Sequence, residues 1–336
     1  MQQNSSQRLS DNLRAASRLS VAPMMDWTTR HCRRFHRLLA PQSLLYTEMV
    51  TTGAILFGDA RRHLFFSQQE QPVALQLGGN EAQALARCAE LAQQYGYAEI
   101  NLNVGCPSDR VQNGAFGACL MKTPEIVAEA VNAMRGAMSL PVTVKCRIGV
   151  DDLDSEAHFR HFAQSVFDAG ADALIVHARK AWLQGLSPKQ NREVPPLDYP
   201  RVHRLKADFP EQFVVINGGI DDFVSVDHHL QRMDGVMLGR AAYQRPWFLA
   251  EAHAQVYGTG LPDRFAVVER MVDYAREEAE QRNVPLRSIA RHMLGLFHGL
   301  PGGKRWRQVI SQGAHKPDAT PDLLLQAMAQ VQERAA

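Results

Sequence analysis

The chain has 336 residues, 45% of them hydrophobic and 21% charged, with 37 basic and 35 acidic side chains and a net charge of +2. This composition is globular, long enough for one large core and a smaller domain, and contains no apolar run near the roughly 20 residues of a membrane-spanning helix. The five cysteines are odd in number and form no Cys-x-x-Cys pair, which argues against a disulfide framework and a zinc site. Residues 1–18 are polar and lack the apolar segment of a secretory signal, so we expect a disordered leader in a cytoplasmic protein.

Eight β-rich runs follow the leader and alternate with amphipathic helical stretches. The predicted strands are Ser20–Met25, Leu44–Val50, Val73–Gly78, Glu99–Val104, Val142–Ile148, Ala173–Ala178, Phe213–Asn217 and Gly235–Gly239. The clearest helices between them are Asn80–Tyr95, Pro124–Met138, Ser155–Ala169 and Asp222–Gln231. Nearly continuous apolar strands indicate a parallel sheet covered on both faces, and eight β/α units in about 250 residues indicate an α/β fold of the TIM (β/α)8 barrel type. A doubly wound sheet fits less well, because no Gly-x-Gly-x-x-Gly follows the first strand.

The pattern changes after about Thr259. The remaining sequence reads as helices only, at Arg264–Asn283, Leu286–Leu296, Gly303–Gln312 and Pro321–Ala335. Two glycines and a proline make Tyr257–Pro262 a plausible joint. We therefore expect a barrel domain over residues 19–257 and a small all-helical domain over residues 262–336.

Polar residues collect where the predicted strands end, which is where the working residues of a TIM barrel lie. They include Gln76, Asn101, Asn103, Lys145, His177, Asn217 and Arg240. Glycine-rich turns after strands seven and eight, at Gly218-Gly219 and Gly239, let backbone N–H groups approach a phosphate. The turns alone do not distinguish a phosphosugar from a flavin.

A lysine inside a barrel is costly unless an anion pairs with it, so Lys145 and the neighbouring His177 favour an anionic ligand. His177 by itself would equally suit a hydrogen-bonded core position. The amides of Gln76 and of Asn101 or Asn103 suit the edge of a pyrimidine-like ring. The apolar segment Pro23, Met24 and Met25 would pack under a flavin, although core packing would look the same.

Two stretches contain basic residues and no acidic ones. Gln281–Pro317 carries seven, and Ala173–Arg192 carries four. Either stretch alone would pass for a solvated loop, but two in one chain favour a polyanionic partner.

Seven segments in order resemble the motifs of the tRNA-dihydrouridine synthase family. They are Val21-Ala-Pro-Met-Met-Asp26, Leu75-Gln-Leu-Gly78, Ile100-Asn-Leu-Asn-Val-Gly-Cys-Pro-Ser108, Val144-Lys-Cys-Arg-Ile148, Ile175-Val-His-Ala-Arg179, Ile216-Asn-Gly-Gly-Ile220 and Leu238-Gly-Arg240. The resemblance runs from about residue 20 to beyond 310. Residues 103–121, with the late His292–Phe297 and Arg305–Arg307 segments, are most similar to the bacterial A subfamily, which modifies uridines 20 and 20a of the tRNA D-loop.

The resemblance implies a flavoenzyme that reduces uridine to 5,6-dihydrouridine. FMN would be held by Pro23, Met24, Met25, Gln76, Lys145, His177, Asn217, Gly218, Gly219, Gly239 and Arg240. NADPH would reduce FMN, hydride would pass from flavin N5 to uracil C6, and Cys106 would protonate C5. Asn103 would orient the uracil, and Cys119, within an apolar run, would be structural.

For tRNA contact we expect Lys189, Arg192, Arg305 and Arg307, on one surface formed by the basic stretches and the helical domain around the barrel mouth. Trp306 would either stack on a base or pack its helix. We expect a monomer with tRNA as partner and no metal or membrane. Two alternatives stay open: a flavin barrel acting on a free pyrimidine or dihydro-orotate, and an RNA-binding barrel without catalysis.

Overall fold

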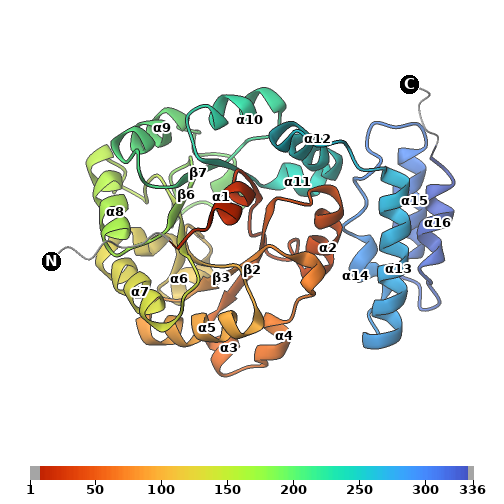
Figure 1. Ribbon diagram of the computed structural model, residues 1–336, viewed down its shortest axis with the longest axis horizontal. Coiled ribbons are helices and arrows are strands. Elements are labelled where there is room, and N and C mark those ends of the chain that lie inside the picture. The colour runs from red at the N-terminus through yellow and green to blue at the C-terminus, as the bar shows by residue number, and fades with distance from the viewer. Residues whose placement is uncertain (1–7, 332–336) are drawn as a thin grey trace. The chain divides into compact units, whose positions relative to one another are not determined.

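The computed structural model describes residues 8–331, without the side chains of Arg110 and Asn113. Eight parallel strands close into a barrel in sequence order, with β8 paired to β1 (Figure 1). They are β1 (Leu19–Val21), β2 (Leu44–Thr51), β3 (Val73–Gly78), β4 (Glu99–Val104), β5 (Val142–Arg147), β6 (Ala173–His177), β7 (Val214–Asn217) and β8 (Gly235–Leu238). The predicted TIM barrel and all eight strands are confirmed.

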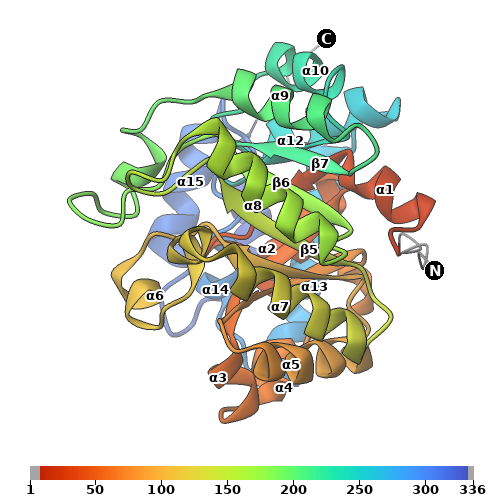
Figure 2. The same cartoon turned by 90° about the vertical axis from the view of Figure 1, so that its left-hand side faces the viewer.

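Burial on both faces explains the apolar strands. Every residue of β3, β4, β7 and β8 is buried. Helices cover the outside, among them α5 (Ala82–Tyr95), α7 (Pro124–Ala137), α8 (Glu156–Asp168), α9 (Tyr199–Asp208) and α10 (Phe223–Leu230). Figure 2 shows α7 and α8 side by side outside β5 and β6. Shorter elements complete the connections: α3 (Thr52–Leu56), α4 (Ala60–Leu64), η1 (Gln68–Glu70), α6 (Asp109–Asn113), η2 (Gly117–Lys122) and η3 (Gln190–Arg192).

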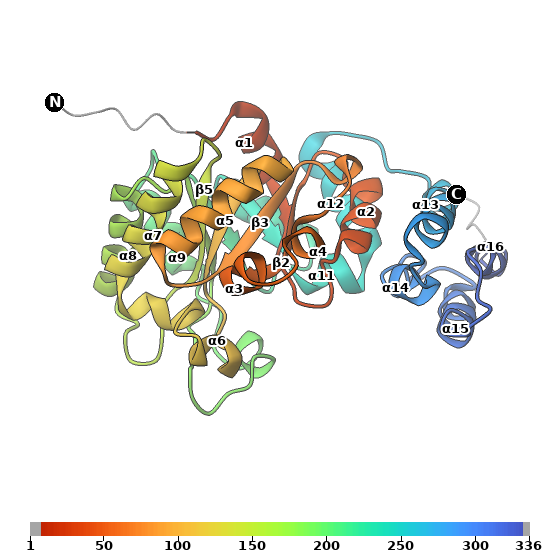
Figure 3. The ribbon, with the colours of Figure 1, turned by 90° about the horizontal axis from the view of Figure 1, so that it is seen from below.

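The predicted disordered leader is wrong for the residues that the structure describes. Asp11–Ser17 forms helix α1, which the Ser10 side chain caps. Leu13 and Ala16 of this helix, and Leu9 just before its cap, share a hydrophobic cluster with inward-facing residues of the strands, such as Met237. Helix α1 therefore closes the barrel at the end opposite α6 (Figure 3). Residues 1–7 of the predicted leader lie outside the described residues.

The chain divides into two compact units, and the division differs from the predicted boundary. The barrel unit ends at Gly239, and the second unit combines residues 26–42 with the chain from Arg240 onward. The second unit contains α2 (Arg30–Leu39), α11 (Arg240–Gln244), α12 (Pro246–Tyr257), α13 (Arg264–Arg282), α14 (Leu286–Ala290), α15 (Gly303–Gly313) and α16 (Asp322–Met328). Its core includes Phe35 of α2 and Trp306 of α15, both fully buried. Residues 26–42 thus belong to the second unit because they pack against segments that are far away in the sequence.

The helices predicted after Thr259 are present, and two are shorter than predicted. Helix α14 ends at Ala290, and the chain continues in turns whose hydrogen bonds join residues three apart, such as Met293 N–H to the Ala290 carbonyl. A Cβ at Gly295 would lie 2.5 Å from the Gln244 carbonyl oxygen. The backbone of these turns is therefore packed closely against residue 244. Helix α16 ends at Met328, and residues 332–335 of its predicted span lie outside the described residues.

Candidate active site

The carboxyl ends of β3 to β7 bring the predicted polar residues together. Strand register places Gln76 beside Asn101, Asn103 beside Lys145, and His177 beside Asn217. Their side chains face the barrel interior because they occupy alternate positions on buried strands. The set gathers at one end of the barrel, as the sequence predicts.

Lys145 is the cation at the centre of this set. Its Nζ donates to Asn217 Oδ1 at 3.1 Å. Among residues 8–331 the structure gives it no ion pair with a carboxylate. Burial, and then the neighbouring Arg147 guanidinium, lowers the pKa of Lys145 to about 8. The ammonium therefore lacks a compensating negative charge, which an anionic ligand would supply.

His177 lies against the turn that follows β7. A Cβ at Gly218 would come within 2.5 Å of the His177 ring, and Gly218 has φ +113°. Only glycine allows both that conformation and this close approach. Burial and the cations Arg147, Lys145, Arg179 and Arg192 lower the pKa of His177 far below its ordinary value. The imidazole is accordingly neutral at physiological pH and has one N–H to donate.

Cys106 lies in the loop between β4 and α6. Asn103 Oδ1 accepts hydrogen bonds from the backbone N–H groups of Gly105 at 3.1 Å and Cys106 at 3.0 Å. Cys106 is partly exposed, and its sulfur lies 3.4 Å from Ser108 Oγ. Asn103 therefore fixes the backbone that carries this thiol.

Cys119 is also partly exposed, but its surroundings differ. Its thiol donates to the Phe116 carbonyl at 3.0 Å, and burial raises its pKa. This hydrogen bond holds the Cys119 side chain against its own turn, which agrees with the predicted structural role. Cys32, Cys88 and Cys146 are buried.

Arg147 connects the loop after β4 with the loop after β6. Its Nε donates to the Gly105 carbonyl at 3.0 Å, next to Cys106. Its Nη1 donates to the carbonyls of Asn191 at 2.8 Å and Lys180 at 3.2 Å, in the loop after β6. The sequence places Arg147 at this strand end but does not reveal these bonds.

The remaining predicted ligands lie around the ends of β1 and β8. Pro23 and Met24 are half-buried, and Met25 is 55% exposed. A Cβ at Gly239 would meet no atom within 4 Å, so its backbone is open to a ligand. Arg240 begins α11 and belongs to the second unit, so the structure does not test its position at the barrel end.

The basic stretches differ in how their side chains are used. Lys180 pairs with Asp154 at 2.7 Å, and Arg179 donates to the Pro195 carbonyl. Lys189 and Arg192 are exposed in the loop after β6.

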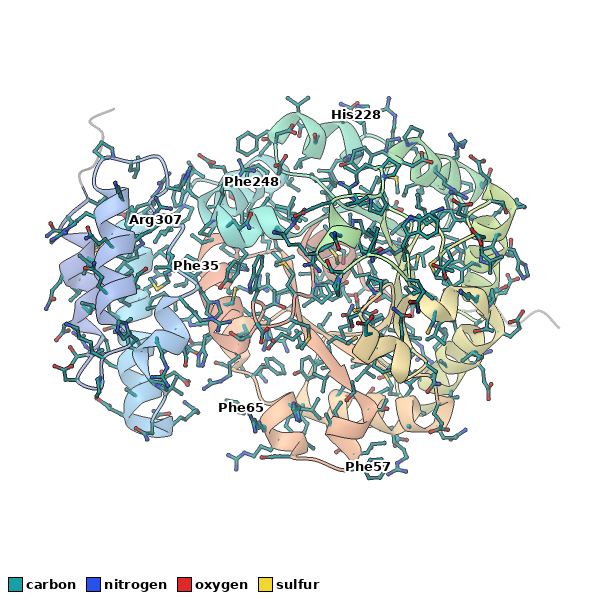
Figure 4. All side chains as sticks on the ribbon, turned by 180° about the vertical axis from the view of Figure 1, so that it is seen from behind. Phe35, Phe57, Phe65, His228, Phe248 and Arg307 are labelled. Carbon is teal, nitrogen blue, oxygen red and sulfur yellow. The ribbon has the colours of Figure 1, made fainter. Side chains whose placement is uncertain are left out.

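In the second unit, Arg305 and Arg307 are exposed on α15, and Figure 4 labels the side chain of Arg307. Trp306 between them is fully buried and donates its Nε1–H to the Met293 carbonyl at 3.1 Å. Trp306 is therefore a packing residue, the second of its two predicted roles.

The chain matches the family model described as Dihydrouridine synthase (Dus) over residues 20–334. It is 55% identical over 317 residues to a tRNA-dihydrouridine(20/20a) synthase of Vibrio cholerae, covering 94% of this chain and 96% of that protein. The chain belongs to the dihydrouridine synthase family. The protein of the same name from Escherichia coli K12 is 54% identical over 322 residues, covering 95% of this chain and 93% of that protein.

A solved structure, morphinone reductase, resembles this chain in fold, with a TM-score of 0.52 and 13% sequence identity over 75% of this chain and 90% of that one. The described residues contain no helix long and apolar enough to cross a membrane. They also contain no cluster of three or more His, Cys, Asp or Glu side chains able to hold a metal ion.

One residue that holds a turn of the candidate site is not predicted from the sequence. Tyr199, at the start of α9, donates its hydroxyl to the Gly218 carbonyl at 2.6 Å. It thereby holds the turn against which His177 lies. A tyrosine at a helix start carries no sequence signal for such a bond, because the partner is 19 residues away.

Proposed function

We propose that this dihydrouridine synthase reduces uridine to 5,6-dihydrouridine at positions 20 and 20a of the tRNA D-loop, using FMN and NADPH. The observation that carries the proposal is the Cys106 loop, anchored by Asn103 beside the partly buried Lys145 ammonium, which has no carboxylate partner among residues 8–331. The printed activity of relatives that are 54–55% identical to this chain supports the choice of substrate.

The residues at the barrel end fit an anionic flavin mononucleotide. Lys145 and His177 would hold the electron-rich edge of the ring, since one is an unneutralised ammonium and the other a neutral N–H donor. The phosphate end would be bound by backbone N–H groups of Asn217, Gly218, Gly219 and Gly239. The Arg240 guanidinium would contribute positive charge. Gln76 would donate to or accept from the ring, and Pro23, Met24 and Met25 would pack on its face. When bound, FMN supplies to uracil C6 the hydride that it receives from NADPH.

Cys106 supplies the second hydrogen. Hydride addition at C6 leaves negative charge on C5 and the adjoining carbonyl, and the thiol donates its proton to C5. The thiolate then regains a proton from solvent, so one hydride and one proton are added in each turnover. Asn103 Nδ2 donates one of its two hydrogens to Gln76 Oε1 at 2.9 Å. The second hydrogen can donate to the uracil and orient it.

Lys189, Arg192, Arg305 and Arg307 would bind the tRNA backbone. All four are exposed, as phosphate contact requires. Such contacts release counterions, so binding should weaken steeply with salt.

The test is mass spectrometry of unmodified tRNA after incubation with the protein and NADPH. The proposal requires a gain of two hydrogens at position 20 or 20a. Reduction of a free pyrimidine, turnover of dihydro-orotate, or binding of tRNA without any mass change would instead support one of the alternative functions.

A further inference from the structure

A continuous line of buried side-chain hydrogen bonds runs inside the barrel toward Cys106. It begins at Glu99, whose Oε1 accepts the Thr143 hydroxyl at 2.6 Å. Asn101 Nδ2 donates to Thr143 Oγ1 at 2.9 Å, and Gln76 Nε2 donates to Asn101 Oδ1 at 2.8 Å. Asn103 Nδ2 donates to Gln76 Oε1 at 2.9 Å. The line ends at Asn103 Oδ1, which accepts from the backbone of the Cys106 loop.

The direction of this line is fixed by its two ends. Backbone N–H groups only donate, so Asn103 must turn its oxygen toward Gly105 and Cys106, and its nitrogen toward Gln76. Gln76 must then present its oxygen to Asn103 and its nitrogen to Asn101, and Asn101 must donate to Thr143. Thr143 donates its single hydroxyl hydrogen to Glu99 Oε1, which also accepts a hydrogen bond from Tyr46. Both ends impose the same orientation on every amide between them.

We propose, on the basis of the proposed function, that Glu99 and Thr143 are positioning residues that act on Cys106 through Asn101, Gln76 and Asn103. Glu99, Gln76 and Asn101 are each no more than 1% exposed, so water does not compete for these bonds. The Thr143 hydroxyl is farther from its other acceptor, the Ile100 carbonyl, at 3.5 Å. Burial raises the pKa of Glu99 to about 7, whereas the hydroxyls of Thr143 and Tyr46 that donate to it lower that pKa.

A generic structural role would explain a buried carboxylate equally well, and Tyr46 allows the two explanations to be separated. The Tyr46 hydroxyl donates to the same Glu99 oxygen at 2.7 Å. Tyr46 is not part of the line to Cys106, although its bond is as short and as buried. Tyr46→Phe is therefore the matched control for Thr143→Val, which keeps the shape of threonine and removes the hydroxyl.

The first readout is the rate at which NADPH-reduced holoenzyme is reoxidised by tRNA. Thr143→Val should lower this rate about tenfold, because the Cys106 loop loses its fixed placement. Thr143→Ser, which restores a hydroxyl, should stay within about twofold of the wild type, and so should Tyr46→Phe. In a Cys106→Ala background, Thr143→Val should change the rate less than about twofold, because the residue through which it acts is absent.

The second readout does not depend on tRNA. Alkylation of the holoenzyme with iodoacetamide, followed by mass spectrometry of Cys106 and Cys119, reports how the loop is held. Thr143→Val should speed alkylation of Cys106 by about threefold or more while leaving Cys119 unchanged, since Cys119 is bonded to Phe116 instead. If Thr143→Val does not fold, Thr143→Ala removes the same hydroxyl and replaces it in both assays.

The inference is overturned if Thr143→Val and Tyr46→Phe behave alike in both assays, or if Thr143→Val slows the Cys106→Ala protein as much as the wild type. Failure of the proposed function looks different. In that case the wild-type holoenzyme itself forms no dihydrouridine in tRNA, while the alkylation rates still test the connection between Thr143 and the Cys106 loop.

Discussion

Lys145 should destabilise the FMN-free protein while strengthening FMN binding. Burial lowers its pKa from the ordinary 10.5 to about 8, which corresponds to about 3 kcal/mol of unfavourable free energy for the ammonium at neutral pH. Lys145→Met removes that charge with a side chain that is only one atom shorter. It also leaves Asn217 Oδ1 without its donor, at a cost of about 1 kcal/mol. The variant should therefore be more stable than the wild type by about 2 kcal/mol at pH 7 in the absence of FMN.

The pH dependence provides an internal check on this prediction. Folded wild-type protein loses the Lys145 proton above about pH 8, whereas unfolded chains keep it until about pH 10.5. Because the unfolded state binds more protons in this window, the contribution of Lys145 to stability rises with pH. The advantage of Lys145→Met should accordingly shrink between pH 8 and pH 10.

Chemical unfolding of both FMN-free proteins at pH 7 and pH 10 measures the effect, and fluorescence titration measures FMN affinity, which should fall by about 2–4 kcal/mol in the variant. A variant that is less stable at pH 7, with a difference independent of pH, would show that Lys145 is not an uncompensated buried charge. Unchanged FMN affinity would remove Lys145 from the cofactor site.

Three further predictions concern the Cys106 thiol, the exposed basic side chains and helix α1. Cys106→Ala should bind FMN and be reduced by NADPH, but its reoxidation by tRNA should fall by roughly 10²–10⁴. Neutralising Lys189, Arg192, Arg305 and Arg307 with glutamine should raise the KM for tRNA at least about tenfold and flatten its salt dependence; unchanged tRNA binding at physiological salt would exclude these contacts. Leu13→Ala should lower the free energy of unfolding by about 2–4 kcal/mol, while the exposed Asn12→Ala should not, and equal stability of the two would mean that α1 does not plug the barrel.

The strands could be predicted because burial on both faces leaves a strong local signal. Each strand is a short apolar run between polar or glycine-rich segments, and most predicted ends agree with the structure within two residues. The first strand is the exception, since it ends at Val21 and not at Met25. Pro23 has no N–H for a strand ladder, which is a physical reason for the early end.

Helix α1 and the two-unit division could not be recovered in the same way. Leu9, Leu13 and Ala16 do have helical spacing, and Ser10 is a good N-cap, but three apolar residues in a polar segment resemble a tail unless the barrel end that buries them is known. The assignment of α2 to the second unit depends on Phe35 joining a core formed some 230 residues later, and no local pattern encodes that packing.

Candidate site residues could be predicted where they lie at a strand end. They could not be predicted where their proposed role depends on hydrogen bonds to residues distant in the sequence. Strand-end residues such as Lys145 and His177 were identified because a TIM barrel works at that end. Glu99 and Thr143 lie deeper, and their polarity alone suggested no role. The signal they carried was alternation, since Glu99, Asn101 and Asn103 place a polar side chain at every second position of a fully buried strand.

Strand β5 shows how this alternation connects the separate parts of the site. Its inward-facing residues are Thr143, Lys145 and Arg147. Thr143 bonds Glu99 and Asn101 in the line toward Cys106, Lys145 bonds Asn217 across the barrel end, and Arg147 holds the Gly105 carbonyl beside Cys106. Because side chains on a strand alternate between faces, a slip of one residue would turn all three out of the barrel together. The register of β5 with β4 and β6 therefore fixes at once the proposed anion site, the Cys106 loop and the line of hydrogen bonds beneath it.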